Sequence, residues 1–113
     1  GGFGISDGEY LPIVKVAPQY PRRALSRGLA GWVIVEFTVT EAGAVRDPFV
    51  VSNCAHIPNA RNPGECEDKP NSVFDSSAKK AALKFKYKPK VIDGVPVETA
   101  GVQNRIKFEL AEG

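Results

Sequence analysis

The sequence is poor in the features of catalysis and membrane insertion. It holds one histidine and no methionine, and no apolar run approaches the roughly 18 residues of a membrane span. His56 has no recognisable Ser or Asp arrangement beside it, and the segment GVPVETAG lacks the glycine spacing and the lysine of a phosphate loop. A net charge of +2 is too small by itself to indicate nucleic-acid binding. We therefore expect no enzyme, no cofactor and no nucleic-acid partner.

The sequence does contain enough apolar material for a globular core. Hydrophobic residues make up 42% and charged residues 25% of the 113 positions, which predicts one soluble domain. The pair Gly1-Gly2 resembles a remnant of processing or cloning. We expect residues 1–9 to be disordered or of that origin, residues 10–113 to form the domain, and the chain to be a fragment of a longer protein.

Cys54 and Cys66 lie in a stretch rich in Asn, Pro and Gly, which predicts one long ordered loop over residues 53–71. A disulfide between them would stabilise the fold by about 3 kcal/mol and indicate an oxidising compartment. This pairing is favoured, because one histidine and two cysteines fall short of the paired ligand clusters of structural zinc sites. Two alternatives stay open: two free thiols, or a metal site with His56 as third ligand and Glu65, Glu67 or Asp68 as the fourth.

The first third of the chain predicts an extended segment, a short helix and a strand. Residues 10–17 are apolar but contain Pro12, which suits an edge or irregular extended segment. Pro21 can occupy the first helical position of a helix over residues 22–27 that ends at Gly28. The residues expected inward on this helix are Ala24 and Leu25. The side chains of residues 31–40 alternate between two faces, which predicts a strand. The face expected to meet the core consists of Val33, Val35, Phe37 and Val39.

The middle of the chain predicts a hairpin and a second helix. Gly43 gives the turn at residues 41–43 a position for positive φ, and Pro48 predicts a bulge or an edge in the returning strand. That strand, residues 44–51, is expected to face the core with Val45, Phe49 and Val51. A helix over residues 72–86 would begin with a capping box, Ser72 with Asp75, and end at Lys88-Pro89. Its apolar stripe consists of Phe74, Ala78, Ala81, Ala82 and Phe85.

The last third predicts a turn at Asp93-Gly94 and a closing strand over residues 101–110. Its inward residues are Val102, Ile106, Phe108 and Leu110, and its solvent-facing residues are Gln103, Arg105, Lys107 and Glu109. The element order predicts an α+β fold, with a small antiparallel sheet of about three to four strands and two helices packed on one face.

Two surface features have both a functional and a structural interpretation. The lysines between residues 79 and 90 would contact an anionic polymer such as cell-wall glycan, or form the solvated face of a helix. Trp32 would be a sugar-stacking platform or a half-buried sheet residue. We prefer the structural interpretation for both, and we expect His56 to be a partly exposed loop residue.

The segments PQYPRRALSRGLAGWVIVEFTVTEAGAV, FDSSAKKAALKFKYKP, GVPV and VQNRIKFEL, in that order, resemble the carboxy-terminal periplasmic domain of the TonB family. Among its members they are most similar to the second-type TonB proteins of Vibrio-like bacteria. The resemblance implies a periplasmic domain of an inner-membrane-anchored protein that works with ExbB and ExbD on the proton gradient. The domain would bind outer-membrane receptors for iron-siderophore complexes, haem or cobalamin by adding the receptor's TonB box as a strand. The loop over residues 53–71 is longer than is usual in the family.

The resemblance also implies which residues contact the receptor. Four residues match the family's Gln-Pro-Gln-Tyr-Pro region, although Ala17 departs from its start: Pro18, Gln19, Tyr20 and Pro21. The closing strand matches the edge to which the TonB box adds, with contact residues Val102, Gln103, Asn104, Arg105, Ile106, Lys107 and Phe108.

These expectations leave two interpretations of the proline-flanked segment. The prolines would hold Gln19 and Tyr20 as a rigid extended platform beside the edge strand, or Tyr20 would cap the core while Pro21 starts the helix. An alternative function is a peptidoglycan-binding or envelope-tethering module that uses the lysines and Trp32, and a weak peptidoglycan contact is compatible with receptor binding. An open edge is also compatible with a homodimer formed by strand exchange as an artefact of truncation, and the sequence leaves the oligomeric state open.

Overall fold

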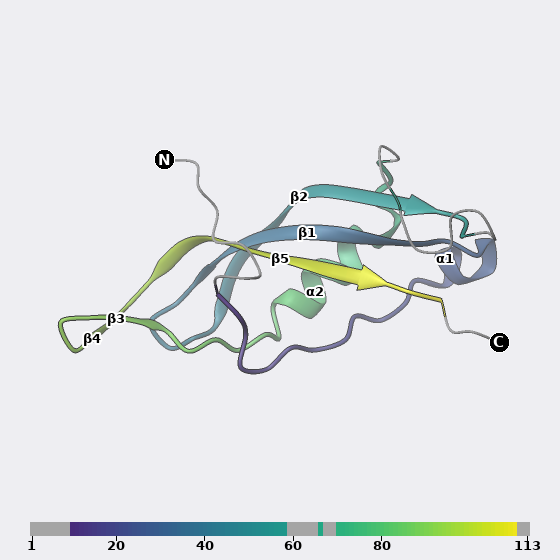
Figure 1. The fold of residues 1–113 in the computed structure, drawn as a ribbon. Coiled ribbons are helices and arrows are strands. Elements are labelled where there is room, and N and C mark those ends of the chain that lie inside the picture. Colours follow the sequence, from purple (N-terminus) through teal and green to yellow (C-terminus); the bar gives the residue numbers. More distant parts are fainter. Residues whose placement is uncertain (1–9, 59–65, 67–69, 111–113) are drawn as a thin grey trace.

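A computed structural model describes residues 10–58, 66 and 70–110. The expectation for residues 1–9 lies outside this range, as does the predicted loop order at residues 59–65 and 67–69. The elements are α1 (Arg22–Arg27), β1 (Ala30–Val39), β2 (Val45–His56), the 3-10 turn η1 (Ser72–Phe74), α2 (Asp75–Ala82), β3 (Lys90–Ile92), β4 (Val95–Val97) and β5 (Thr99–Phe108) (Figure 1). None of the helices in the described part of the chain has the length and apolarity that a membrane crossing requires.

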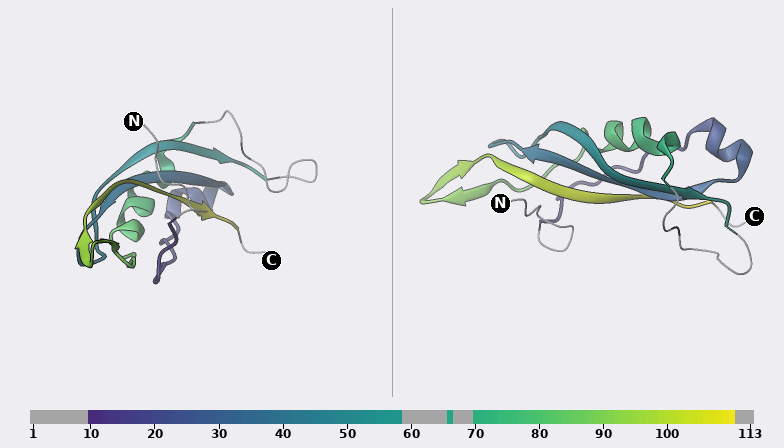
Figure 2. Two further views of the ribbon diagram at one scale, coloured as in Figure 1. Left: turned by 60° about the vertical axis from the view of Figure 1, so that its left-hand side comes forward. Right: turned by 90° about the horizontal axis from the view of Figure 1, so that it is seen from above.

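The main sheet is antiparallel and has three strands in the order β2-β1-β5. Both helices lie on one side of it, as the view from above shows (Figure 2). The predicted α+β class is therefore confirmed. The sequence predicted only a turn at Asp93-Gly94, whereas the structure builds the hairpin β3–β4 around it, with positive φ angles of 51° and 79° at these two residues.

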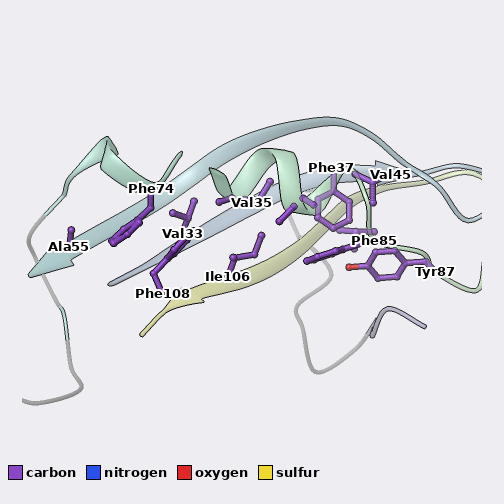
Figure 3. Packing of buried hydrophobic residues seen from close by; sticks show 14 of the residues in the cluster. Val33, Val35, Phe37, Val45, Ala55, Phe74, Phe85, Tyr87, Ile106 and Phe108 are labelled. Atoms are coloured by element: carbon purple, nitrogen blue, oxygen red, sulfur yellow. The ribbon is translucent and has the colours of Figure 1, made fainter. Parts of the chain in front are cut away.

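The core fills the space between the sheet and α2 (Figure 3). All five residues of the predicted helix stripe are buried, and all four predicted inward residues of β1 are buried. The rings of Phe74 and Phe108 stack with their centroids 4.2 Å apart, which joins the start of the helical region to the end of β5. Truncating an aromatic residue at such a position typically costs about 3 to 5 kcal/mol.

The side-chain alternation predicted for β2 is wrong after its first residues. Val45 is buried as expected, but Phe49 is 52% and Val51 is 48% exposed. The predicted bulge at Pro48 explains this, because Asp47 and Pro48 together oppose one residue of β1 and shift the register. The shift turns Phe49 and Val51 to the outer face of the sheet and lets Val50 pack against the core.

The helix boundaries also differ from the predictions. Leu25 is 53% exposed rather than inward, and Pro21 is the N-cap of α1 rather than its first helical residue. The predicted capping box is wrong: the Asn71 side chain accepts from the Val73 N–H, and the Asp75 carboxylate accepts from Asn53. The helix α2 ends at Ala82, well before Pro89. Leu110, expected inward, is only partly buried and follows β5.

Candidate peptide-binding edge

The strand β5 forms one edge of the main sheet, as expected for the closing strand. Its pairing with β1 is continuous from Val102 opposite Phe37 to Phe108 opposite Gly31. The register shifts only before this stretch, where Gly101 has a φ of 72°. Because alternate residues of a strand direct their N–H and C=O groups to opposite sides, about half of Val102–Phe108 presents backbone groups to the open side.

The strand β2 forms the other edge of the sheet and is less suitable for pairing. Its register shifts twice against β1, and its first irregularity combines a positive φ of 55° at Asp47 with Pro48, which has no N–H. A bulged edge resists the addition of a further strand. The uninterrupted edge is therefore that of β5.

A groove borders β5 on its open side. Four residues of the extended segment form one wall and three residues of β5 form the other: Lys15, Val16, Ala17 and Pro18, and Arg105, Ile106 and Lys107. The groove has a volume of about 860 Å³. Three of these residues are cationic and none is acidic, so the groove favours an anionic occupant.

The wall opposite β5 belongs to an extended segment that runs along the helical side of the sheet toward α1 (Figure 1). Val14 pairs with Lys86 through backbone hydrogen bonds, and the Tyr10 hydroxyl donates to the Lys88 carbonyl at 2.6 Å. Farther along, the Ser77 hydroxyl of α2 donates to the Gln19 carbonyl. These contacts hold the segment at several points, so the groove has a fixed second wall.

Tyr20 caps the core, which supports the structural interpretation of this residue. Its hydroxyl donates to the Leu29 carbonyl at 2.5 Å, and its ring meets Phe74 and Phe108 edge-on, with centroids 5.6 and 5.7 Å away. Burial raises the pKa of Tyr20 above the ordinary value. Gln19 differs, because its side chain is exposed while its carbonyl is held by Ser77.

The structure brings only some of the predicted contact residues together. Pro18, Arg105, Ile106 and Lys107 line the groove, whereas Gln19, Tyr20 and Pro21 line a second cleft of about 410 Å³ between the segment and α2. Residues 15–17 were not among the predicted contact residues, because their place beside β5 depends on the tertiary fold.

Several predicted contact residues on β5 can contribute only their backbone. Val102, Ile106 and Phe108 belong to the core, and Asn104 is 1% exposed on the same face. Its Oδ1 atom has no hydrogen-bond partner among the described residues. Gln103 donates from Nε2 to the Glu36 carboxylate at 2.8 Å on the outer face. The outward side chains Gln103, Arg105 and Lys107 are therefore the ones that can contact an added strand.

The predicted disulfide is present between Cys54 and Cys66, with an S–S distance of 2.01 Å. It consumes both thiols, so the metal site and the free thiols are excluded as alternatives; no group of three or more potential ligands occurs among the described residues. Cys54 lies within β2, which continues to His56 and so extends into the stretch predicted as loop. His56 is 7% exposed, not partly exposed as expected.

Trp32 and the lysines of α2 lie on opposite faces of the sheet. Trp32 alternates with the buried residues Val33 and Val35 and therefore points to the outer face, while α2 covers the core face. It is half-buried, and its indole N–H donates to the Cys66 carbonyl at 3.0 Å. A single glycan surface built from the lysines of α2 and Trp32 does not form.

Comparisons with known proteins agree with this geometry. Residues 16–56 match the family model described as the Gram-negative bacterial TonB protein C-terminal. The chain is 30% identical over 90 residues to the Protein TonB of Pseudomonas aeruginosa, a match that covers 80% of this chain. The chain spans 22% of the length of that relative.

Two solved structures resemble the whole described fold. The Pseudomonas aeruginosa TonB CTD, solved by solution NMR, has a TM-score of 0.62 and 27% identity, with 96% of this chain and 95% of that chain covered. The TonB2 protein from Vibrio anguillarum has a TM-score of 0.58 and 31% identity, with 99% and 91% covered.

Proposed function

Because the chain belongs to the family of Gram-negative bacterial TonB C-terminal domains, we propose that it is the receptor-binding domain of a TonB-type energy transducer. Its binding partner is an extended segment of a TonB-dependent outer-membrane receptor, the TonB box, which adds to β5 as a further strand. Domains of this family are not enzymes, and neither is this chain.

The observation that carries the proposal is the open, regular edge of β5 beside a groove with a fixed second wall. An extended peptide in that groove satisfies its backbone against β5 in the way that strand addition requires. The outward side chains of β5 contribute little apolar contact, so recognition depends mostly on backbone hydrogen bonds.

The expected affinity is weak to moderate. About six new backbone hydrogen bonds at a net 0.5 to 1.5 kcal/mol each give a gross gain of roughly 3 to 9 kcal/mol. Ordering the peptide and losing its translational freedom offset much of that gain. A contact of this strength releases readily, which suits a domain that must engage and leave its receptor.

The proposal extends to the protein that carries this domain. It is anchored in the inner membrane, works with ExbB and ExbD on the proton gradient, and exposes this domain, residues 10–113, in the periplasm. The receptors that it serves import iron-siderophore complexes, haem or cobalamin. The Cys54–Cys66 disulfide supports the periplasmic location, because that compartment is oxidising.

An amide NMR titration with a peptide carrying a receptor TonB box tests the proposal. We expect saturable shifts concentrated at Val102–Phe108 and at Lys15–Pro18. The amides of β2 serve as an internal control, because its bulged edge should not pair. Shifts of equal size at both edges, or none at millimolar peptide with the fold intact, would contradict strand addition at β5.

Gln19 provides a second test, because its side chain is exposed and it directly follows Pro18, the last residue of the groove wall. We expect Gln19→Ala to weaken peptide binding by up to about fivefold, the loss of one hydrogen bond, without lowering the thermal midpoint. Ser26→Ala, a change at an exposed position on α1, is a matched control. Unchanged binding together with a lower thermal midpoint would assign Gln19 a purely structural role.

A further inference from the structure

The side of the sheet that the two helices cover, called here the helical face, carries a local concentration of positive charge, although the whole chain has a net charge of only +2. Its cations are exposed, and none forms an ion pair with a described carboxylate. They are Arg22, Arg23, Arg27, Lys79, Lys80 and Lys84. The one acidic residue within α1 or α2 is Asp75, which accepts from Asn53 of β2. The helical face therefore lacks carboxylates of its own to balance its charge.

The charges of the two helices meet at the cleft of about 410 Å³ between the extended segment and α2. Arg22 from the start of α1 lines this cleft together with Lys80 of α2 and Lys84, and no acidic residue lines it. Both helices lie on the same side of the sheet (Figure 2). The cations thus form one patch across two elements, and an anionic partner relieves their mutual repulsion.

Each helix also exposes a leucine beside one of these cations. Leu25 follows Arg22 by three residues and is 53% exposed, and Leu83 follows Lys80 by three residues and is 51% exposed. Residues three apart in a helix share a face. A single exposed leucine is ordinary on a protein surface. Here, however, both helices combine a cation with a leucine, which is the composition that favours the interface between water and anionic lipid.

We propose that the helical face docks on the surface of a phospholipid bilayer that contains anionic lipids. The cations lie at the lipid phosphates, and Leu25 and Leu83 enter the layer just below the headgroups. The outer face of the sheet, which carries Trp32, is then turned away from the bilayer. The inference goes beyond the proposed function and involves neither β5 nor the groove beside it.

Sedimentation with large unilamellar vesicles tests the proposal. One set of vesicles consists of phosphatidylcholine alone, and the other contains about one third phosphatidylglycerol. We expect the intact domain to bind the anionic vesicles at least about tenfold more tightly at low salt, with most of the preference lost at about 1 M salt. Equal binding to both sets, or none to either, would overturn the inference.

Two charge variants locate the contact. Arg22→Gln with Lys80→Gln should weaken binding to the anionic vesicles by about tenfold or more, because each cation close to an anionic surface contributes roughly fivefold. The matched control, Lys88→Gln with Lys90→Gln, removes the same charge from exposed positions beyond α2 and should weaken binding by less than about threefold. Equal losses in the two pairs would show that only the net charge matters and would overturn the docking face.

The leucines distinguish a bilayer from a soluble anionic partner. Leu25→Gln with Leu83→Gln leaves the charge unchanged and should weaken vesicle binding by about fivefold or more, because apolar contact with the lipid is lost. Polyglutamate should bind the unaltered domain more weakly than the anionic vesicles do. An unchanged vesicle affinity in the leucine pair, or polyglutamate binding as tight as vesicle binding, would overturn the bilayer and assign the face to an acidic peptide.

The orientation of the bound domain provides a readout that needs no variant. A lipid with a spin label on its headgroup broadens the NMR signals of nearby groups, and we expect the strongest broadening at Arg22–Arg27 and Lys79–Lys84. The Trp32 indole N–H, on the outer face, is the internal control and should broaden least. The strongest broadening at Trp32 or at the hairpin β3–β4 would overturn the inference, and this measurement decides if a variant does not fold. Peptide pairing at β5 is tested separately, so either proposal can fail without the other.

Discussion

Single residues show how closely backbone segments approach one another in this fold. Gly43 lies in the β1–β2 turn at a φ of 83°, and its carbonyl accepts from the Tyr87 N–H at 2.9 Å. An added Cβ at this position would lie 2.1 Å from the Tyr87 carbonyl oxygen. Glycine is therefore required at position 43 for two reasons: the backbone has a positive φ, and the Tyr87 backbone leaves no room for a Cβ.

We predict that Gly43→Ala lowers the free energy of unfolding by about 3 kcal/mol or more, because both the left-handed backbone and the clash oppose it. Gly28→Ala is the matched control, since Gly28 has a φ of 67° but nothing within 4 Å of an added Cβ. It should cost only about 1 to 2 kcal/mol. Chemical denaturation measures both values, and equal losses would show that the approach to Tyr87 is unimportant.

At the scale of elements, the two edges of the sheet differ because of local backbone chemistry. Asp47 and Pro48 interrupt β2, while β5 is interrupted only at Gly101, before its paired stretch begins. The uninterrupted edge is the one beside the groove. The same bulge that protects one edge from pairing also places Phe49 and Val51 on the outer face.

A small polar network joins β2 to the start of the helical region. The Asn53 side chain donates to the Asp75 carboxylate at 3.0 Å, and its oxygen accepts the Asn71 N–H at 3.0 Å. Asn71 in turn caps η1 by accepting from the Val73 N–H at 2.9 Å. The network sets where the helix begins relative to the sheet.

We predict that Asn53→Ala costs about 1 to 3 kcal/mol of stability, because Asp75 loses a partner in a partly buried region and the exposed Asn71 N–H also loses one. Asn71→Ala removes only the cap at Val73 and should cost about 1 kcal/mol. Urea denaturation with an unchanged slope measures both. A larger loss for Asn71→Ala than for Asn53→Ala would contradict this account of the network.

At the scale of the whole molecule, two tyrosines attach the extended segment to the rest of the fold. Tyr10 donates to Lys88 after α2, and Tyr20 donates to Leu29 before β1. Burial raises the pKa of both hydroxyls above the usual 10.0. Because ionisation is thus less favourable in the folded state, the stability from these groups is complete below pH 10 and is lost as the pH rises through the folded pKa values.

We predict that the thermal midpoint falls as the pH rises above about 10. Tyr20→Phe should lower stability at neutral pH by about 1 kcal/mol, through the lost hydrogen bond, and weaken the alkaline decline. The double variant with Tyr10→Phe should weaken it further. Midpoints recorded between about pH 8 and 11 provide the measurement. An identical decline in the double variant would assign the alkaline sensitivity to other groups.

Elements whose signals are local and periodic could be predicted from the sequence. The alternation of Val33, Val35, Phe37 and Val39 and the helix stripe from Phe74 to Phe85 both describe faces that are buried in the structure. Such patterns are reliable because burial repeats at the period of the backbone. The separated motifs also sufficed for the family, whereas the sequence favoured the disulfide and left a metal site and free thiols open.

Contacts between residues far apart in the chain could not be predicted from local patterns. A one-residue change of register at a bulge turned Phe49 and Val51 to the outer face. The helical region begins at η1 with a cap from Asn71, which Asn53 holds, rather than with a cap from Ser72. The groove combines Lys15 with Arg105, and the disulfide places the Cys66 carbonyl beside the Trp32 indole. These contacts join positions that are distant in sequence, and no local propensity encodes them, because their energy exists only after the sheet has assembled.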